Sequence, residues 1–115
     1  MVSRGFRITQ DREIKRVLKL GRRFSSPECS LYMLANTLGH PRMTVVVSAG
    51  VSKLAVDRNR LKRQMRDVLR QGIEQKRIAF NFDIIAVLRA PALKIADVGR
   101  RAFFQGLLEK ARLLK

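Results

Sequence analysis

The stretch RNRLKR, at residues 58–63, places four positive side chains and one amide in six positions. Guanidinium and ammonium groups at this density suit phosphate binding, and the planar fork of arginine also fits the edges of bases. The amide of Asn59 can hydrogen-bond a base edge or a 2′-hydroxyl, although an ordinary helix-surface asparagine explains it equally well. The stretch is therefore consistent with a flexible basic tail, a solvated helix face or a phosphate-binding surface.

The surrounding residues predict an amphipathic helix over residues 57–72, which excludes a flexible tail. Apolar side chains recur at i, i+4, i+7 and i+8, the spacing of one helix face, at Leu61, Met65, Val68 and Leu69. Asp57 suits the N-cap, and Gly72 suits the C-terminal stop. We expect the apolar face to pack in the core and to hold the charged side chains in fixed rows that face solvent.

The charges of this helix are almost all positive, since Asp57 and Asp67 are its only acidic residues. Cations stand at successive i+4 steps, at Arg58, Lys62, Arg66 and Arg70. Like charges at this spacing repel one another, and a solvated helix face usually alternates its signs. A phosphate-rich partner turns the repulsion into attraction and releases counterions. The helix therefore predicts a surface that binds nucleic acid.

Groups suited to covalent or metal chemistry are sparse. The chain has nine acidic residues, one histidine (His40) and one cysteine (Cys29). A self-sufficient nuclease would need clustered acids or histidines, and His40 has no Cys, Ser or carboxylate partner at a suggestive spacing. Cys29 lies in an apolar run, which is typical of a small core residue in a reducing compartment. We therefore expect no catalytic and no metal-binding residue in the protein.

Two further helices are predicted towards the ends of the chain. The first spans residues 11–20, with Asp11 as its N-cap and Gly21 as a C-terminal cap in the left-handed conformation. Its apolar face is made of Ile14, Val17 and Leu18. The last spans residues 98–114, with Asp97 as its cap and apolar positions that include Val98, Ala102, Leu107 and Ala111.

Residues 21–24, 29–34, 43–47 and 82–88 are predicted to be strands. Turn residues at 36–41 favour an antiparallel hairpin of 29–34 with 43–47. The basic helix lies between 43–47 and 82–88, so this crossover can place those two strands parallel. The predicted fold class is α/β (α+β): a single small sandwich of a mixed, mainly antiparallel four-stranded sheet packed with three helices. We expect one RNA-binding domain over residues 1–115, with residues 1–10 loosely ordered.

Composition supports a polyanionic partner. Twenty-five Lys and Arg residues stand against nine Asp and Glu, for a formal net charge of +16, and 46% of the residues are hydrophobic, as in globular proteins. The chain has no long apolar run and a charged N-terminal stretch, so we expect a cytoplasmic protein. A membrane-surface helix is disfavoured, because the basic helix has no Trp or Phe and needs its apolar stripe for the core.

Together these motifs resemble the bacterial ribonuclease P protein component. The signature R-N-R-[IL]-K-R matches residues 58–63, after a strand that ends in Val47-Ser48. The flanks agree as well: the basic helix EIKRVLKLG, the strand SLYML and the strand that begins at Asp83. The resemblance covers nearly the whole chain. It implies a left-handed crossover through the basic helix, contrary to the common rule.

The resemblance implies a subunit that binds a catalytic RNA and the 5′ leader of precursor tRNA, to support endonucleolytic 5′ maturation of tRNA. Catalysis then belongs to the RNA subunit, Mg²⁺ is bound mainly by RNA, and neither DNA nor membrane is a partner. The residues implied to bind the RNA subunit are Arg58, Asn59, Arg60, Lys62, Arg63, Arg66 and Arg70. Those implied to bind the leader are Tyr32, Ser48 and Lys53. The chain departs from the family by carrying Ile14 and Leu18 where aromatic residues are common, and Ala49-Gly50 in place of a lysine pair.

Other interpretations share some of these features. A ribosomal or other structural RNA-binding protein of similar fold would have the same charge and basic helix without a role in cleavage. A DNA-binding helix-turn-helix protein is disfavoured by the strand-rich first half of the chain.

Overall fold

The computed structural model describes residues 7–75, 77 and 82–112. The elements follow in the order α1 (Asp11–Leu20), β1 (Arg22–Ser25), β2 (Cys29–Ala35), β3 (Arg42–Val47), α2 (Ala55–Glu74), β4 (Phe82–Leu88), η2 (Ala90–Lys94), η3 (Asp97–Gly99) and α3 (Arg100–Lys110). Within the start of the chain, which we expect to be loosely ordered, Ile8 is 3% exposed and its N–H donates to the Met43 carbonyl at 3.0 Å. Residues 1–6 lie outside the described residues.

The four strands form one mixed sheet in the order β1-β2-β4-β3. β4 pairs antiparallel with β2 and parallel with β3, so the parallel crossover through α2 is confirmed. The predicted hairpin of β2 with β3 is wrong, because β4 lies between them. β4 buries Ile84, Ile85, Ala86 and Leu88. A strand that is apolar on both faces is most stable at the centre of a sheet, where both of its edges are paired and both of its faces are covered.

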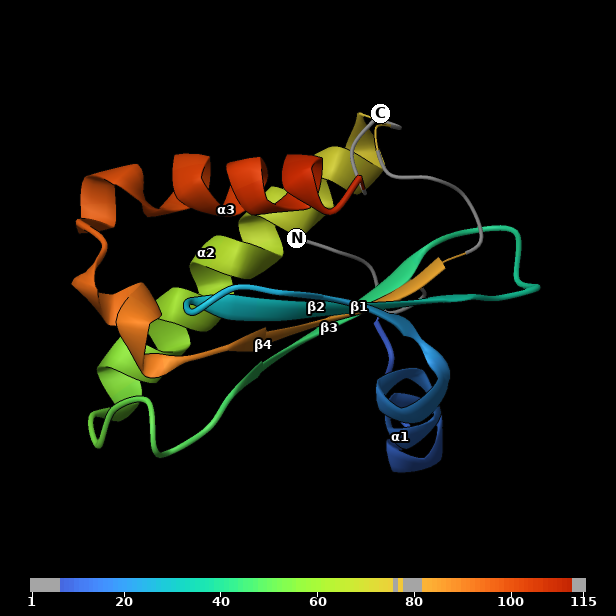
Figure 1. Ribbon diagram of the computed structural model, residues 1–115, viewed down its shortest axis with the longest axis horizontal. Helices are drawn as coiled ribbons and strands as arrows, with labels where there is room; N and C mark the ends of the chain where they lie inside the picture. Colours follow the sequence, from blue (N-terminus) through green and yellow to red (C-terminus); the bar gives the residue numbers. More distant parts are fainter. Residues whose placement is uncertain (1–6, 76, 78–81, 113–115) are drawn as a thin grey trace.

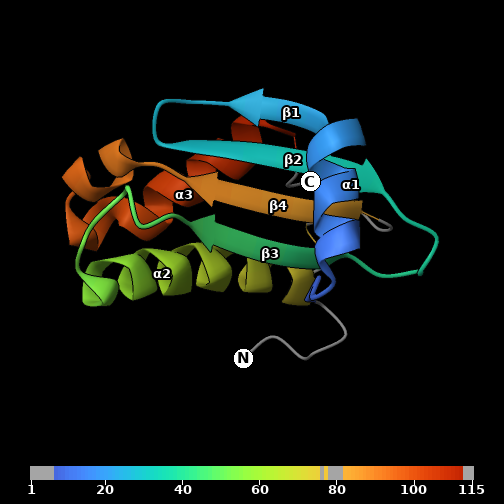
Figure 2. The same ribbon diagram turned by 90° about the horizontal axis from the view of Figure 1, so that it is seen from below.

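Helices cover both faces of the sheet (Figure 1). α2 and α3 lie together on one face, over the main core, which includes Leu31, Met43 and Phe104. α1 lies alone on the other face, where Val17 packs with Ile85 in a small second cluster. Figure 2 shows that α1 crosses this face only at one end of the sheet. The predicted sandwich is therefore confirmed, and one sheet face is left partly uncovered by helices.

The connection from β3 through α2 to β4 is left-handed. In Figure 2 the two strands run side by side in the same direction, and α2 lies on the far side of the sheet. Viewed from the side of α2 with both strands pointing up, β4 then lies to the left of β3. About 98% of such crossovers are right-handed, so the resemblance implied a feature that hydrophobic periodicity alone does not predict.

α1 ends at Gly21 for a reason other than the predicted one. The φ of Gly21 is −71°, outside the left-handed region, and its N–H donates to the Val17 carbonyl. A Cβ at this position would lie 2.5 Å from the Val17 carbonyl oxygen and 3.0 Å from that of Met33. Glycine is required here because two backbone segments approach closely. The N-cap of α1 is Gln10 rather than Asp11, which is the first helical residue.

α2 extends beyond both predicted ends. Its N-cap is Leu54, so Asp57 lies in the first turn, where its carboxylate accepts a hydrogen bond from the Ser52 hydroxyl at 3.2 Å. Gly72 is buried within the helix and does not stop it. A buried glycine lets a helix pack closely, and the rest of α2 has enough buried surface to tolerate its low helix propensity.

α3 is shorter than predicted. Asp97 begins the 3₁₀ turn η3, and the α-helix starts at Arg100. Val98 is 96% exposed and Ala102 is also exposed, so these two apolar positions do not face the core, whereas Leu107 and Ala111 are buried as predicted. The tight turn directs Val98 outwards. Predicted helical residues 113 and 114 lie outside the described residues.

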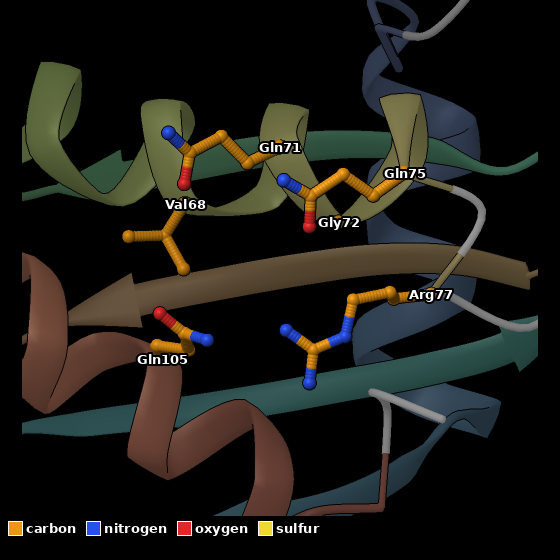
Figure 3. A pocket seen from close by; sticks show the side chains of 6 residues that line it. All are labelled: Val68, Gln71, Gly72, Gln75, Arg77 and Gln105. Atoms are coloured by element: carbon orange, nitrogen blue, oxygen red, sulfur yellow. The ribbon is translucent and has the colours of Figure 1, made fainter.

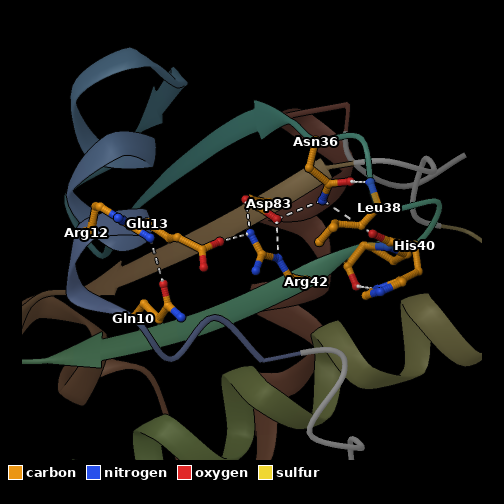
Figure 4. Close-up of polar contacts among 9 residues, drawn as sticks. Gln10, Arg12, Glu13, Asn36, Leu38, His40, Arg42 and Asp83 are labelled. Carbon is orange, nitrogen blue, oxygen red and sulfur yellow. Dashed lines mark hydrogen bonds and ion pairs between the residues drawn. The ribbon is translucent and has the colours of Figure 1, made fainter.

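A polar cluster ties α1 to the sheet (Figure 4). Arg42 donates from Nε and Nη2 to the buried Asp83 carboxylate, at 2.9 and 2.8 Å, and also forms an ion pair with Glu13 of α1. Asn36 donates to the same carboxylate at 2.8 Å. The hydrogen bonds that Arg42 donates to Asp83 raise the pKa of the Arg42 guanidinium, against the opposing effect of burial. The cluster joins three elements, β3, β4 and α1, at one end of the sheet.

Arg42→Ala should lower the free energy of unfolding, because it removes the bidentate partner of a buried carboxylate. The expected loss is about 2–4 kcal/mol, between that of a charged hydrogen bond and that of a broken buried ion pair. Urea denaturation measures it. Arg12→Ala is the matched control on α1, since Arg12 is exposed and its change should stay within about 0.5 kcal/mol. A loss for Arg42→Ala no larger than that of the control would contradict the structural role of the cluster.

Candidate RNA interface

The buried face of α2 fixes the direction of its basic side chains. Leu61, Met65 and Leu69 are fully buried in the main core. Gln64 is also buried, and its amide donates to Asp97 at 2.8 Å and accepts from Arg100 at 3.4 Å. Packing and hydrogen bonds therefore hold α2 against the sheet and against the segment before α3.

One flank of α2 carries Arg58, Lys62 and Arg66, which we call the basic flank. Successive helical residues are rotated by about 100°, so these three fall on one side of the buried stripe. That side faces the outer edge of β3, because Arg66 lines a cavity together with residues of β3. All three are half-buried, as is Arg70, so the expectation that the row faces solvent is only partly right. Asn59, Arg60 and Arg63 are exposed.

The cations of α2 have few partners within the protein. Asp67 pairs with Arg101 of α3 at 3.0 Å and with Arg70 at 3.8 Å. In the described part of the chain, no acidic oxygen lies within 4.0 Å of the side-chain nitrogens of Arg58, Arg60, Lys62, Arg63 or Arg66. Most of the positive charge that the sequence places on this helix is therefore not neutralised by the protein.

Arg58 has a second role that the sequence did not reveal. Its Nη1 donates to the Ser52 carbonyl at 2.6 Å, while the Ser52 hydroxyl donates to Asp57. These bonds hold the loop between β3 and α2 at the first turn of the helix. Ser48 and Lys53, both implied to bind the leader, are exposed in this loop. Arg58 thus links the basic helix to the predicted leader-binding residues.

The uncovered part of the sheet lies on the same side as α1, and we call it the open sheet face, made by Arg23, Tyr32, Val46, Val87 and Arg89. Tyr32 is half-buried beside the small cluster under α1, with the Arg23 guanidinium 5.7 Å from its ring centroid. Val46 is 37% exposed. The loop with Ser48 and Lys53 lies on this side of the sheet too (Figure 1). Tyr32 and the loop that carries Ser48 and Lys53 therefore lie on the same side of the sheet.

Arg89 belongs to this face, although the sequence analysis missed it. Its Nη2 donates to the Ser30 hydroxyl at 2.6 Å and its Nη1 to the Ser26 carbonyl at 3.2 Å. The two-residue alternation of β4 continues from Ile85 and Val87 to position 89, and that alternation was the available signal. On α1, Ile14 packs in the small cluster and Leu18 is 39% exposed, so aliphatic side chains stand where the family often has aromatic ones.

A second cavity lies between the end of α2 and α3, and it is not suited to a ligand. Figure 3 shows amide side chains and Arg77 around it. Its lining residues are Val68, Gln71, Gly72, Gln75, Arg77 and Gln105. The enclosed space is about 10 Å³, close to the roughly 10–15 Å³ that one water molecule needs. We therefore assign no site to this cavity.

The described residues contain no group of three His, Cys, Asp or Glu side chains that can hold a metal ion. Burial raises the pKa of the Cys29 thiol to about 12, so it is not a thiolate nucleophile at neutral pH. Nδ1 of His40 lies 3.2 Å from the Pro41 carbonyl oxygen, in the loop that follows β2.

None of the helices in the described part of the chain combines the length and the apolar character that a membrane span needs.

Comparison with solved structures confirms the predicted fold class. The RNase P protein of Staphylococcus aureus superposes with a TM-score of 0.83 at 24% sequence identity, over 96% of this chain and 98% of that one. The RNase P protein of Thermotoga maritima superposes with a TM-score of 0.76 at 22% identity, over 90% of this chain and 96% of that one. At these identities the likeness establishes the fold alone.

Sequence comparison identifies the family. The family model for Ribonuclease P matches residues 2–112. The ribonuclease P protein component of Syntrophomonas wolfei is 30% identical over 113 residues, which cover 98% of this chain and 92% of the relative. That of Ectopseudomonas mendocina is 39% identical over 95 residues, which cover 77% of this chain and 68% of the relative. The family model and both relatives agree with the resemblance found in the sequence, and the chain therefore belongs to the bacterial Ribonuclease P protein family.

Proposed function

We propose that this chain docks the catalytic RNA of ribonuclease P through α2 and holds the 5′ leader of precursor tRNA on the open sheet face. Membership of the family makes it a subunit of a tRNA-processing endoribonuclease that works with an RNA subunit and precursor tRNA. The observation that carries the docking surface is the set of unneutralised cations on a helix whose opposite face is buried. The comparisons give no support to the alternative of a ribosomal or other structural RNA-binding protein.

In this proposal the RNA subunit performs the cleavage and binds most of the Mg²⁺, while the protein positions the leader of the precursor tRNA. The high pKa of Cys29 and the scattered acids of the described residues support this division of labour. We further propose that the complex acts in the cytoplasm, with neither DNA nor membrane as a partner.

The α2 surface offers mainly groups that bind phosphates, and fewer groups that can distinguish one base from another. Exposed Arg60 and Arg63 can reach phosphates without rearranging the fold, and Asn59 offers an amide to a base edge or a 2′-hydroxyl. Arg58 and Lys62 are half-buried, and Arg58 is also held by its bond to the Ser52 carbonyl. Side chains that are already held in place lose less conformational entropy when RNA binds.

On the open sheet face, the chemistry suits an unpaired strand. The Tyr32 ring can stack on a base, and the guanidinium groups of Arg23 and Arg89 can meet the backbone. Lys53 and Ser48 extend this surface towards the start of α2. The RNA subunit and the leader therefore meet the protein on adjoining surfaces.

The division of labour is tested by incubating the purified chain with labelled precursor tRNA and Mg²⁺, with and without a cognate RNA subunit. We expect no site-specific cleavage by the protein alone, and cleavage at low Mg²⁺ only when both subunits are present. Site-specific cleavage by the protein alone that persists in RNase-free controls would contradict the assignment of catalysis to the RNA.

Tyr32→Ala should weaken binding of leader-bearing precursor tRNA to the holoenzyme much more than binding of mature tRNA. The expected loss is about 1–3 kcal/mol, the value of one base stacked on an aromatic ring. Equilibrium binding with both RNAs measures it, and Tyr32→Phe is the control because it keeps the ring. An equal loss for the two RNAs, with a folded variant, would mean that Tyr32 only packs beside α1.

The docking surface is tested by a triple variant, Arg60→Ala, Lys62→Ala and Arg63→Ala, which spares the Arg58 bond to Ser52. Each lost phosphate contact lowers the slope of log affinity against log salt by about 0.7–0.9, so the slope for the RNA subunit should fall by two to three units. The matched control removes Arg12, Lys15 and Arg16 from α1. If both triple variants give the same slope, α2 contributes only general charge and is not the docking surface.

A further inference from the structure

A surface cavity lies at the outer edge of β3, next to the basic flank of α2. It encloses about 180 Å³. Its walls come from the segment before α1, from β3 and from α2: Arg7, Ile8, Thr9, Met43, Thr44, Val45 and Arg66. A single water molecule needs only about 10–15 Å³ in the same measure, so this cavity has room for a larger group.

Two arginines from distant parts of the sequence line this cavity. The backbone of Arg7 forms an isolated β-bridge with Met43 at the outer edge of β3, and Arg66 belongs to the basic flank of α2. No acidic residue lines the cavity, and neither arginine has an ion pair within the described residues. Nε of Arg7 is buried and makes no hydrogen bond to any of the described residues. Buried donors without an acceptor are rare in folded proteins, so we expect a ligand to supply an acceptor for this N–H group.

The charges around the cavity are unfavourable until an anion enters. Burial lowers the pKa of the Arg66 guanidinium, and the nearby charge of Arg7 lowers it further. An oxyanion would relieve both effects, because it accepts hydrogen bonds and neutralises the two cations. Arg7, Arg66 and Thr44 all line the cavity, and guanidinium groups bind the oxygens of a phosphate group through paired N–H donors. The cation pair excludes a metal ion as the ligand.

We propose that the cavity binds one backbone phosphate of an RNA strand, held between Arg7 and Arg66. This inference rests on the proposed function. Thr44 lies on the same face of the sheet as the open sheet face, and Arg66 lies on the basic flank. The cavity is therefore located where the open sheet face and the basic flank meet. The phosphate belongs either to the RNA subunit or to the precursor strand, and the two sources share the same chemistry.

Arg7→Ala tests the site, because Arg7 lies outside the signature helix. It should lower RNA affinity about tenfold or more, the usual effect of losing a charged hydrogen bond, and reduce the salt slope by about 0.7–0.9. Arg7→Lys keeps the positive charge but lacks the paired N–H donors of a guanidinium group. At low salt it should therefore recover only part of the RNA affinity that Arg7→Ala loses. Thermal unfolding without RNA should show no loss for Arg7→Ala, since the change removes a repulsion. Arg16→Ala, at an exposed position on α1, is the control for loss of one charge.

A double-mutant cycle with Arg66→Ala distinguishes a shared phosphate from two independent contacts. If both arginines hold one phosphate, the double variant should lose clearly less affinity than the product of the two single losses. Binding to the RNA subunit alone, and to the holoenzyme with leader-bearing and leaderless precursors, identifies which strand supplies the phosphate. Additive losses, or an Arg7→Ala variant that binds every RNA like Arg16→Ala, would overturn the proposal. The proposed function would still stand if the Arg60, Lys62 and Arg63 triple variant lost affinity in the same assay.

Discussion

α2 buries Leu61, Met65 and Leu69 in the main core, and this burial holds its cations in place against their mutual repulsion. Complete burial of one such side chain contributes about 1.5–3 kcal/mol, whereas each exposed like-charged i+4 pair costs only about 0.2–0.5 kcal/mol. Packing therefore exceeds repulsion several-fold. Because of this difference, one helix can complete the core and still present a surface that has no internal counter-charge.

The same packing decides how each cation is presented. Arg58 and Lys62, next to the buried stripe, are half-buried, and long basic side chains at such positions can lay their aliphatic stems along the protein and keep their charged heads in solvent. Residues farther round the helix, such as Arg60 and Arg63, project freely. The interface therefore combines side chains that are already oriented with side chains that can adapt. Oriented groups favour a defined docking geometry, and mobile groups favour rapid electrostatic capture of RNA.

Local sequence patterns predicted the elements well but not their long-range arrangement. The stripe of α2 follows from residue spacing and the extent of β4 from a continuous apolar run, because both are local signals. The turn residues at 36–41 suggested a hairpin, since nothing within that segment indicates that β4 later inserts between β2 and β3. The pairing of Arg42 with Asp83, 41 residues apart, depends on this insertion. The cavity formed by Arg7 and Arg66 depends on it too, because it needs β3 at the edge of the sheet.

Placing β3 at the edge also determines how the two proposed RNA surfaces relate. The chain passes from β3 directly into α2, so the basic flank borders the sheet edge rather than its centre. α1, held at one end by the Arg42 cluster, leaves the open sheet face uncovered up to that edge. An RNA strand on the open sheet face can therefore reach the basic flank by crossing a single strand edge, without passing over a helix. The insertion of β4 thus stabilises the core and also brings the proposed leader surface next to the proposed surface for the RNA subunit.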